Sequence, residues 1–411
     1  MSKRVVITGV GLISGLGESA ALLHQKLCAG TGGLGEITEY GPQGFDSQPG
    51  GSISNFAPEL YLKGRTLRPL DRTGRLFASA AKLALESSGW TAEYLATHDV
   101  GVVLGTMFGS MHTISQFDRQ ALVDGPSCVS PMDFSNTVIN SAAAQTAIWH
   151  KLRGINSTTA SGATSGLMAI GYAADLIQCG RQNAVLAGGA DEFCFESFCG
   201  MERAGLLSGP SSKRGCAIPF DQRRTGMALS EAAALLALED WESAQARGAT
   251  VLGEICGHAN AYNPAWNQHG RGQEAISRAM QGALDNARLS AAEIDCISAA
   301  ANGSVADDKN EALAISAVFN GQASRVSLTA IKSMLGETLG AAGILQSIDF
   351  LETMRTSVLP GIAGLAQVDQ ELASLNFCRQ PKFLSARAAL INGVGFDGHA
   401  CSLIITAPPQ A

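Results

Sequence analysis

The chain has 411 residues, of which 46% are hydrophobic and 16% are charged, and its formal net charge is -7 at pH 7. So much apolar sequence can bury a large core and excludes an intrinsically disordered chain. The net negative charge gives the chain no general attraction for nucleic acid or an anionic membrane. Apolar stretches such as residues 232–238 are too short to span a bilayer.

Strand-like and helix-like segments alternate in the N-terminal part of the chain. β-Branched residues predict a first strand over residues 4–8, and the spacing of apolar residues predicts a helix over residues 75–88. A nearly continuous apolar run over residues 229–238 predicts a strand in the middle of a sheet. The other expected elements are strands at residues 100–104 and 184–187 and helices at residues 110–122, 141–149 and 167–178.

The C-terminal part continues this alternation. We expect helices at residues 274–288 and 340–354 and strands at residues 295–299, 326–329, 388–392 and 402–406. The order is typical of a layered α/β protein with mixed sheets. No linker rich in proline or serine divides the chain, and the best candidate for a boundary between two halves is residues 247–253. We therefore predict two halves, residues 1–250 and 251–411, that pack as one body.

The ten cysteines and seven histidines form no pattern that is typical of a metal site. No two cysteines have the CxxC spacing, and the histidines do not cluster. We therefore interpret the cysteines as reduced thiols of a cytoplasmic protein and expect neither a metal nor another cofactor.

Two short motifs suggest chemistry that their surroundings do not support. Residues 393–398 match the G-x-G-x-x-G pattern of dinucleotide sites, but a strand is expected to follow where such a site needs a helix. Asp307, Asp308 and Glu311 could pass for catalytic acids. A solvated helix start explains them better, with Asp307 or Asp308 as the helix cap.

Six segments, in chain order, resemble the elongating β-ketoacyl-acyl-carrier-protein synthases. Residues 219–226 match the family pattern Pro-Phe-Asp-x-x-Arg-x-Gly, and residues 332–343 match Lys-Ser-x-x-Gly-His-x-x-Gly-Ala-Ala-Gly except at the histidine. Residues 392–398 resemble the Phe-Gly-Phe-Gly-Gly gate loop of the family. The other segments are residues 4–14, 160–166 and 185–191. The resemblance covers essentially the whole chain and implies a thiolase-like fold, a five-layer α-β-α-β-α sandwich of two related halves with mixed sheets.

The resemblance also implies which positions carry the family's chemistry. A cysteine at a helix N-terminus attacks the acyl thioester, and two histidines hold the malonyl group and stabilise the enolate. In this chain those positions hold Ala163, Asn302 and Glu337. A methyl group cannot attack a thioester, an amide cannot act as an imidazole, and a charged carboxylate opposes a developing enolate. Lys332 and Phe396, by contrast, match residues that the family retains.

Three such replacements argue for a natural loss of activity. The combination resembles the chain-length factor, the ketosynthase β subunit of type II polyketide systems, and related subunits of aryl polyene pathways. Such a subunit pairs with an active ketosynthase α subunit and shapes the tunnel for a product made with an acyl carrier protein. Many chain-length factors have glutamine at the cysteine position, so Ala163 departs from their pattern. The alternative is a stand-alone malonyl-carrier-protein decarboxylase or thioesterase that uses Asn302, Glu337 or a cysteine elsewhere.

Met111, Ile114 and Asp118 share one face of the helix expected at residues 110–122. By the resemblance, this helix lines the acyl tunnel from across the subunit interface, with Ile114 at the gating position. Ordinary dimer packing explains Met111 and Ile114 equally well. Asp118 is harder to explain in that way, because a carboxylate in an apolar interface needs a partner.

Five cations lie close together on this acidic chain, with only Asp71 among them. They are Lys63, Arg65, Arg68, Arg72 and Arg75. Carrier proteins are acidic, and the resemblance places carrier docking nearby, so the run is a candidate contact for the carrier protein or the partner subunit. A solvated helix face is an equally good interpretation.

Overall fold

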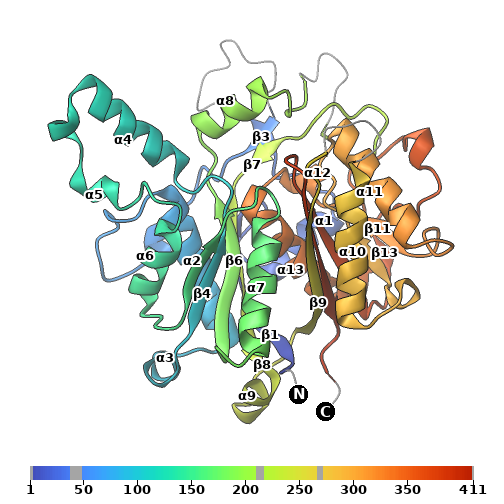
Figure 1. Ribbon diagram of the computed structural model, residues 1–411, viewed down its shortest axis with the longest axis horizontal. Coiled ribbons are helices and arrows are strands. Elements are labelled where there is room, and N and C mark those ends of the chain that lie inside the picture. Colours follow the sequence, from blue (N-terminus) through green and yellow to red (C-terminus); the bar gives the residue numbers. More distant parts are fainter. Residues whose placement is uncertain (1–2, 38–48, 210–216, 266–271, 410–411) are drawn as a thin grey trace.

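The computed structural model describes residues 3–37, 49–209, 217–265 and 272–409 of the chain. Three layers of helices enclose two layers of strands, and Figure 1 shows these layers from left to right. The five-layer α-β-α-β-α sandwich with mixed sheets that the sequence predicted is therefore confirmed.

Ten strands are hydrogen-bonded side by side and divide into two sets of five. In sheet order, the first set is β5 (Asn156–Thr159), β4 (Gly101–Gly105), β6 (Ala184–Asp191), β8 (Ala232–Asp240) and β1 (Val5–Ser14). The second set is β11 (Ser327–Thr329), β10 (Cys296–Ser298), β14 (Ala388–Val394), β15 (His399–Thr406) and β9 (Gly253–Tyr262). In both sets the first three strands run parallel and the next two pair antiparallel. The chain also visits the strands of both sets in the same order, so the two halves are related.

The two sets of strands meet at a short joint, where residues 5–7 of β1 pair with residues 253–255 of β9. Helices α7 (Ser165–Gln178) and α13 (Ala342–Thr356) lie between the sets and contact strands of both. Their apolar side chains belong to a single buried core. Because both faces of this central layer are covered, the loops at the start of α7 and α13 have fixed positions.

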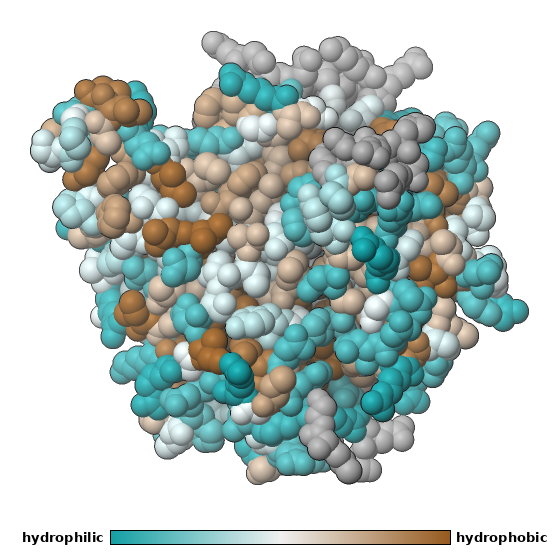
Figure 2. All heavy atoms as spheres, in the orientation of Figure 1, coloured by the Kyte–Doolittle hydropathy of each residue, from teal (hydrophilic) through white to brown (hydrophobic). Residues whose placement is uncertain are grey.

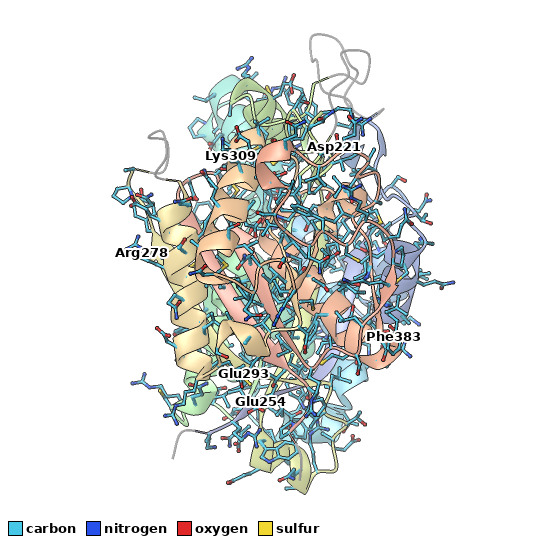
Figure 3. All side chains as sticks on the ribbon, turned by 90° about the vertical axis from the view of Figure 1, so that its right-hand side faces the viewer. Asp221, Glu254, Arg278, Glu293, Lys309 and Phe383 are labelled. Atoms are coloured by element: carbon cyan, nitrogen blue, oxygen red, sulfur yellow. The ribbon has the colours of Figure 1, made fainter. Side chains whose placement is uncertain are left out.

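Helices form the two outer layers. On the N-terminal half these are α2 (Arg72–Ser88) and α6 (Ser141–His150), and on the C-terminal half α10 (Gln273–Ala287) and α11 (Val305–Val318). Their apolar faces pack toward the strands, while Arg278 of α10 and Lys309 of α11 lie on the outer surface (Figure 3).

Smaller elements complete the fold. The remaining helices outside the arm described below are α1 (Ala20–Cys28), α3 (Ala92–Thr97), α8 (Phe195–Arg203), α9 (Trp241–Ala246) and α12 (Lys332–Leu335). The remaining strands are β2 (Gly35–Glu36), β3 (Pro49–Gly51), β7 (Leu229–Ser230), β12 (Val358–Leu359) and β13 (Lys382–Phe383). Short 3-10 helices lie at Pro58–Leu60, Pro126–Cys128, Ala291–Glu293, Leu339–Ala341 and Gln370–Leu372. None of the described helices is long and apolar enough to cross a membrane.

The apolar run at residues 229–238 forms two strands, β7 and β8, rather than the single strand that was expected. Glu231 separates them and is only 1% exposed. Its carboxylate accepts hydrogen bonds from Arg72 Nε at 2.7 Å and from the backbone N–H of Phe193 at 3.0 Å. These donors come from segments distant in sequence and hold the carboxylate inside the molecule, which interrupts the strand. The expected division of the chain between residues 250 and 251 falls between α9 and β9, and it stays a prediction.

An arm formed by α4 (Met111–Val123) and α5 (Pro131–Phe134) projects from the N-terminal half (Figure 1). None of the residues in these two helices is buried. The large apolar side chains that are exposed on the arm and just after it are Leu122, Val123, Met132, Phe134, Val138 and Ile139. We call these six residues the arm patch, and Figure 2 shows hydrophobic surface at the arm.

Candidate functional site

Ala163 lies where β5 leads into α7, one residue before the cap of that helix. It is 5% exposed. The backbone N–H groups at the start of a helix stabilise an anion, so this position suits a thiolate nucleophile. The methyl group of Ala163 supplies neither a nucleophile nor a charge.

Asn302 and Glu337, which by resemblance correspond to the family's two histidines, lie side by side in a buried polar cluster with Lys332. Asn302 Nδ2 donates to Glu337 Oε2 at 2.9 Å, and Lys332 Nζ donates to the same oxygen at 2.7 Å. The other carboxylate oxygen accepts the backbone N–H of Leu339 at 3.0 Å. Glu337 is 0% exposed, Lys332 4% and Asn302 7%. The carboxylate is thus held by a cation and two further donors, which is what a charge in a protein interior requires.

Asp308 of α11 positions the loop that carries Asn302. Its Oδ1 accepts the backbone N–H of Asn302 at 3.1 Å and that of Gly303 at 3.3 Å. Its Oδ2 accepts the N–H of Phe220 at 2.9 Å and lies 3.6 Å from Arg224 Nε. Asp308 is completely buried, and burial raises its pKa to about 7.

Glu311, one turn further along α11, binds the preceding part of the same loop. It accepts the backbone N–H groups of Ala300 and Ala301, both at 2.9 Å, and the Asn392 side chain at 2.9 Å. Burial raises the pKa of this carboxyl group. Because Asn392 begins the gate loop, Glu311 links that loop to the one that carries Asn302.

The interpretation of Asp307, Asp308 and Glu311 as a solvated helix start was wrong. Ser304 caps α11 by accepting the N–H of Asp307, while Asp308 and Glu311 point into the protein. Asp308 and Glu311 are three residues apart, and this spacing indicates that they share one face of the helix. The sequence could not show that a loop packs against this face and donates several backbone N–H groups to the two carboxylates.

Phe396 and the gate loop lie next to the segment that contains Ala163. A methyl group added at Gly162 would come within 2.7 Å of Asp397 Oδ2, and one added at Gly393 would lie 3.6 Å from the Cα of Thr164. Phe396 is partly buried against an apolar cluster. The cluster consists of Phe193, Phe198, Met201, Leu207, Met227, Leu229 and Leu339.

This apolar cluster also reaches the polar one, because the Met227 sulfur lies 3.6 Å from Asn302 Nδ2. The apolar cluster is therefore shared by Phe396 and the loop of Asn302, and the gate loop lies next to the segment that contains Ala163. No direct contact joins Ala163 to Asn302 or Glu337 among the described interactions.

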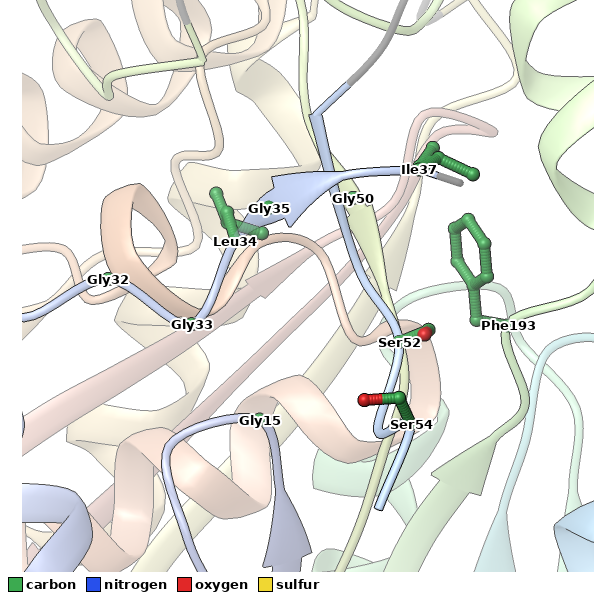
Figure 4. Close-up of a pocket in the computed structure, with 10 residues that line it drawn as sticks. All are labelled: Gly15, Gly32, Gly33, Leu34, Gly35, Ile37, Gly50, Ser52, Ser54 and Phe193. Atoms are coloured by element: carbon green, nitrogen blue, oxygen red, sulfur yellow. The ribbon is translucent and has the colours of Figure 1, made fainter. Parts of the chain in front are cut away.

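A hollow of about 380 Å³ opens beside the apolar cluster, and its lining includes Phe193 of the cluster and Ile37, which packs against the cluster (Figure 4). The rest of its lining is Gly15, Gly32, Gly33, Leu34, Gly35, Gly50, Ser52 and Ser54. These ten residues offer hydroxyl and backbone groups but no ionisable side chain. The hollow can hold a ligand by shape and hydrogen bonding, and its described lining supplies no acid or base.

The three tunnel candidates all lie on the arm. Met111 and Ile114 are half-buried on α4, and Asp118 is exposed. A hydrogen bond anchors the start of α4, because Glu192 accepts the backbone N–H of His112 at 2.9 Å. Burial raises the pKa of Glu192 to about 8. The structure thus fixes the base of the arm and leaves the face with the three candidates outside the core. Their role in a tunnel stays a prediction.

The five cations of the basic run have different environments. Lys63, Arg65 and Arg68 are exposed, and the Arg65 guanidinium lies 6.0 Å from the centre of the Trp149 ring. Arg72 is bound to the buried Glu231, and the half-buried Arg75 donates to a backbone carbonyl. Arg72 therefore serves the fold, and docking at this run would depend on its three exposed members. In the part of the chain that the structure describes, no cluster of three or more His, Cys, Asp and Glu residues is placed to hold a metal ion.

Two family models match the chain. The N-terminal domain of β-ketoacyl synthases matches residues 2–244, and the C-terminal domain of these synthases matches residues 249–366. The chain belongs to the β-ketoacyl synthase family.

Similar members of this family match the chain from end to end. It is 31% identical to nodulation protein E of Rhizobium sp. (strain N33), over 97% of this chain and 98% of that protein. It is 29% identical to 3-oxoacyl-[acyl-carrier-protein] synthase 2 of Coxiella burnetii, over 98% of both. A solved structure described as the ishigamide ketosynthase/chain length factor covers the whole of both chains, with a TM-score of 0.91 and 28% identity.

The ion pair of this ketosynthase-fold protein gives a stability prediction. Glu337→Gln leaves Lys332 as a buried cation without its carboxylate, and we expect a loss of about 3 kcal/mol in the free energy of unfolding. The double variant Lys332→Met with Glu337→Leu should lose less than Glu337→Gln alone, because no charge then remains unpaired. Urea denaturation measures both.

The matched control is Glu86→Gln, which breaks the exposed pair of Lys82 and Glu86 on α2. Its cost should stay below about 1 kcal/mol. A Glu337→Gln protein as stable as the Glu86→Gln protein would contradict a structural role for the buried pair.

Proposed function

We propose that this chain is the non-catalytic subunit of a ketosynthase pair. As a chain-length factor, it would bind an active ketosynthase α subunit in the cytoplasm and shape the acyl tunnel that sets the length of a polyketide or polyene. The product would be built on an acyl carrier protein. The observation that carries the proposal is the buried cluster of Lys332, Glu337 and Asn302, where a condensing enzyme needs two free imidazoles.

The contacts of this cluster are incompatible with the condensation chemistry. The Asn302 amide is already bound, since Nδ2 contacts Glu337 and Met227 and Oδ1 accepts the backbone N–H of Ser304. Neither oxygen of Glu337 is free to act as a base. With Ala163 at the nucleophile position, no acyl-enzyme can form there. These facts also argue against a stand-alone decarboxylase or thioesterase that uses Asn302 or Glu337.

Two features of the surface support a partner of the same fold. The arm patch presents exposed apolar residues on a projecting element, and such patches are typical of protein–protein interfaces. β5 is the last strand of its set, so one of its edges has no neighbouring strand in the described sheet. A similar solved structure is described as a ketosynthase/chain length factor, which agrees with this role.

The first experiment measures pairing. We expect the chain, co-expressed with the active ketosynthase of the same gene cluster, to purify as a one-to-one complex that extends acyl chains. Leu122→Asp with Val123→Asp should weaken the complex at least roughly tenfold, because these arm-patch side chains are 86% and 72% exposed in the isolated chain.

The control for this experiment is Phe383→Asp. Phe383 is 79% exposed on β13 of the C-terminal half, away from the arm, and its replacement should leave the complex intact (Figure 3). The chain alone should neither decarboxylate nor hydrolyse malonyl carrier protein. Turnover of that substrate by the isolated chain would favour the stand-alone enzyme instead.

The second experiment addresses the tunnel. In the reconstituted pair, Ile114→Trp adds bulk at the proposed gating position, and we expect shorter products by mass spectrometry. Gln116→Trp is the control, because Gln116 is an exposed residue of the same helix outside the face of Met111, Ile114 and Asp118. An unchanged length distribution in the Ile114 variant would refute the tunnel role.

The third experiment addresses carrier docking. Lys63→Glu, Arg65→Glu and Arg68→Glu together should weaken binding of an acidic carrier protein roughly tenfold, and added salt should reduce the difference. Arg72 is left unchanged because it stabilises the buried Glu231. Lys82→Glu, an exposed cation of α2, is the control. Identical titration curves for the triple variant and the unchanged protein would exclude docking here.

A further inference from the structure

A second cluster of reactive side chains lies at the end of α13 that is remote from the candidate site. His24 and Cys28 come from α1, and Asp349 and Thr356 come from α13. His24 Nδ1 lies 2.8 Å from Asp349 Oδ1, and Nε2 lies 3.0 Å from Thr356 Oγ1 and 3.5 Å from Cys28 Sγ. A thiol, an imidazole and a carboxylate are therefore aligned as in cysteine-dependent catalytic sites.

The hydrogen bonds define the protonation state of the imidazole. Burial raises the pKa of Asp349 and its hydrogen bond with His24 lowers it; as a carboxylate facing Nδ1, Asp349 accepts from this nitrogen. The Thr356 hydroxyl donates its only hydrogen to the carbonyl of Glu352 at 2.9 Å, so its oxygen must accept from Nε2 of His24. Both ring nitrogens then carry hydrogens, and His24 is an imidazolium.

The effects on the pKa of His24 agree with this geometry. Burial alone would lower the pKa of His24, but its hydrogen bonds with Asp349 and Cys28 outweigh burial and raise the pKa to about 10. His24 is 4% exposed and Asp349 2% exposed. Cys28 lies at the boundary of the cluster and is partly exposed. The sulfur of Cys28 lies 3.5 Å from Nε2 of His24, and nucleophilic cysteines are typically paired with a histidine in this way.

We propose that Cys28 is a modification site whose sulfur, held against the ring of His24, reacts with hydrogen peroxide. The sulfur attacks one peroxide oxygen, an S–O bond forms and the O–O bond breaks. Cysteine is oxidised by two electrons to sulfenic acid, and the peroxide is reduced. The departing hydroxide takes the proton from His24 Nε2 and leaves as water. Asp349 holds the ring in position and is a positioning residue.

The other cysteines with perturbed acidity are poor nucleophiles by comparison. Burial raises the pKa of Cys194 to about 12 and that of Cys256 to about 11, and it also raises the pKa values of Cys296 and Cys401. Cys378 lies near Cys28. Burial raises the pKa of Cys378, and Lys382 lowers it. Cys28 differs from these thiols because its sulfur lies 3.5 Å from the ring of a buried histidine.

The test uses the full-length protein under limiting hydrogen peroxide, with sulfenic acid trapped by dimedone and measured peptide by peptide. Cys128 and Cys179 are exposed and serve as standards inside the same molecule. We expect labelling at Cys28 to be roughly tenfold faster than at either standard, although Cys28 is less exposed. Labelling no faster than at the standards would overturn the proposal without the need for any variant.

Two variants identify the cause of the reactivity. His24→Gln should slow labelling at Cys28 to the rate of the standards, while the buried Cys296 and Cys401 stay unlabelled and confirm that the protein is folded. Cys28→Ser should abolish the labelled peptide and leave complex formation with the ketosynthase intact. Fast labelling that persists in His24→Gln would also overturn the proposal.

Discussion

The buried carboxylate of Glu337 is the group on which the arrangement of the site depends. A charge in the interior must be matched by donors, and here those donors are Lys332, Asn302 and the backbone of Leu339. The backbone of Glu337 is fixed as well, because its N–H donates to the carbonyl of Ala228 and its carbonyl accepts the N–H of Ser230. The loop before α13 is therefore attached at once to α12, to the loop of Asn302 and to the segment that leads into β7.

The next buried carboxylates, Asp308 and Glu311, are also matched by hydrogen-bond donors. Asn302 can reach Glu337 only if its loop is held in place, and Asp308 and Glu311 bind four consecutive backbone N–H groups of that loop. Glu311 in turn binds Asn392 at the start of the gate loop. The loops around Asn302 and Glu337 are therefore held in fixed positions by buried side chains. Under the proposed function this is expected, since a partner subunit still needs the shape of the fold.

The overall fold could be predicted from the sequence, because helical spacing, apolar runs and six family segments agree over the whole chain. Errors arose where a charged residue has partners far away in sequence. Glu231 interrupts an apolar run because Arg72 binds it, and Asp308 and Glu311 looked solvated because their loop partners are not visible in the helix pattern. The assignment of Ala163, Asn302 and Glu337 to the family's reactive positions rests on resemblance and stays a prediction. That Asn302 and Glu337 contact each other, and that Lys332 neutralises Glu337, required the structure.

Stability alone does not explain why the pair of Lys332 and Glu337 is present. Apolar residues of similar volume in place of a buried ion pair often leave a protein equally stable or more stable. Positional specificity is the better explanation, because the loop after Glu337 fits closely against two other segments. A methyl group at Gly166 would come within 2.1 Å of the Gly340 carbonyl oxygen, and one at Gly189 within 1.9 Å. Because the segments approach so closely, the loop must keep one position. The hydrogen bond from the Leu339 N–H to the Glu337 carboxylate is directional and holds the loop against α7 and β6. An apolar pair at these two positions would offer no such directional contact.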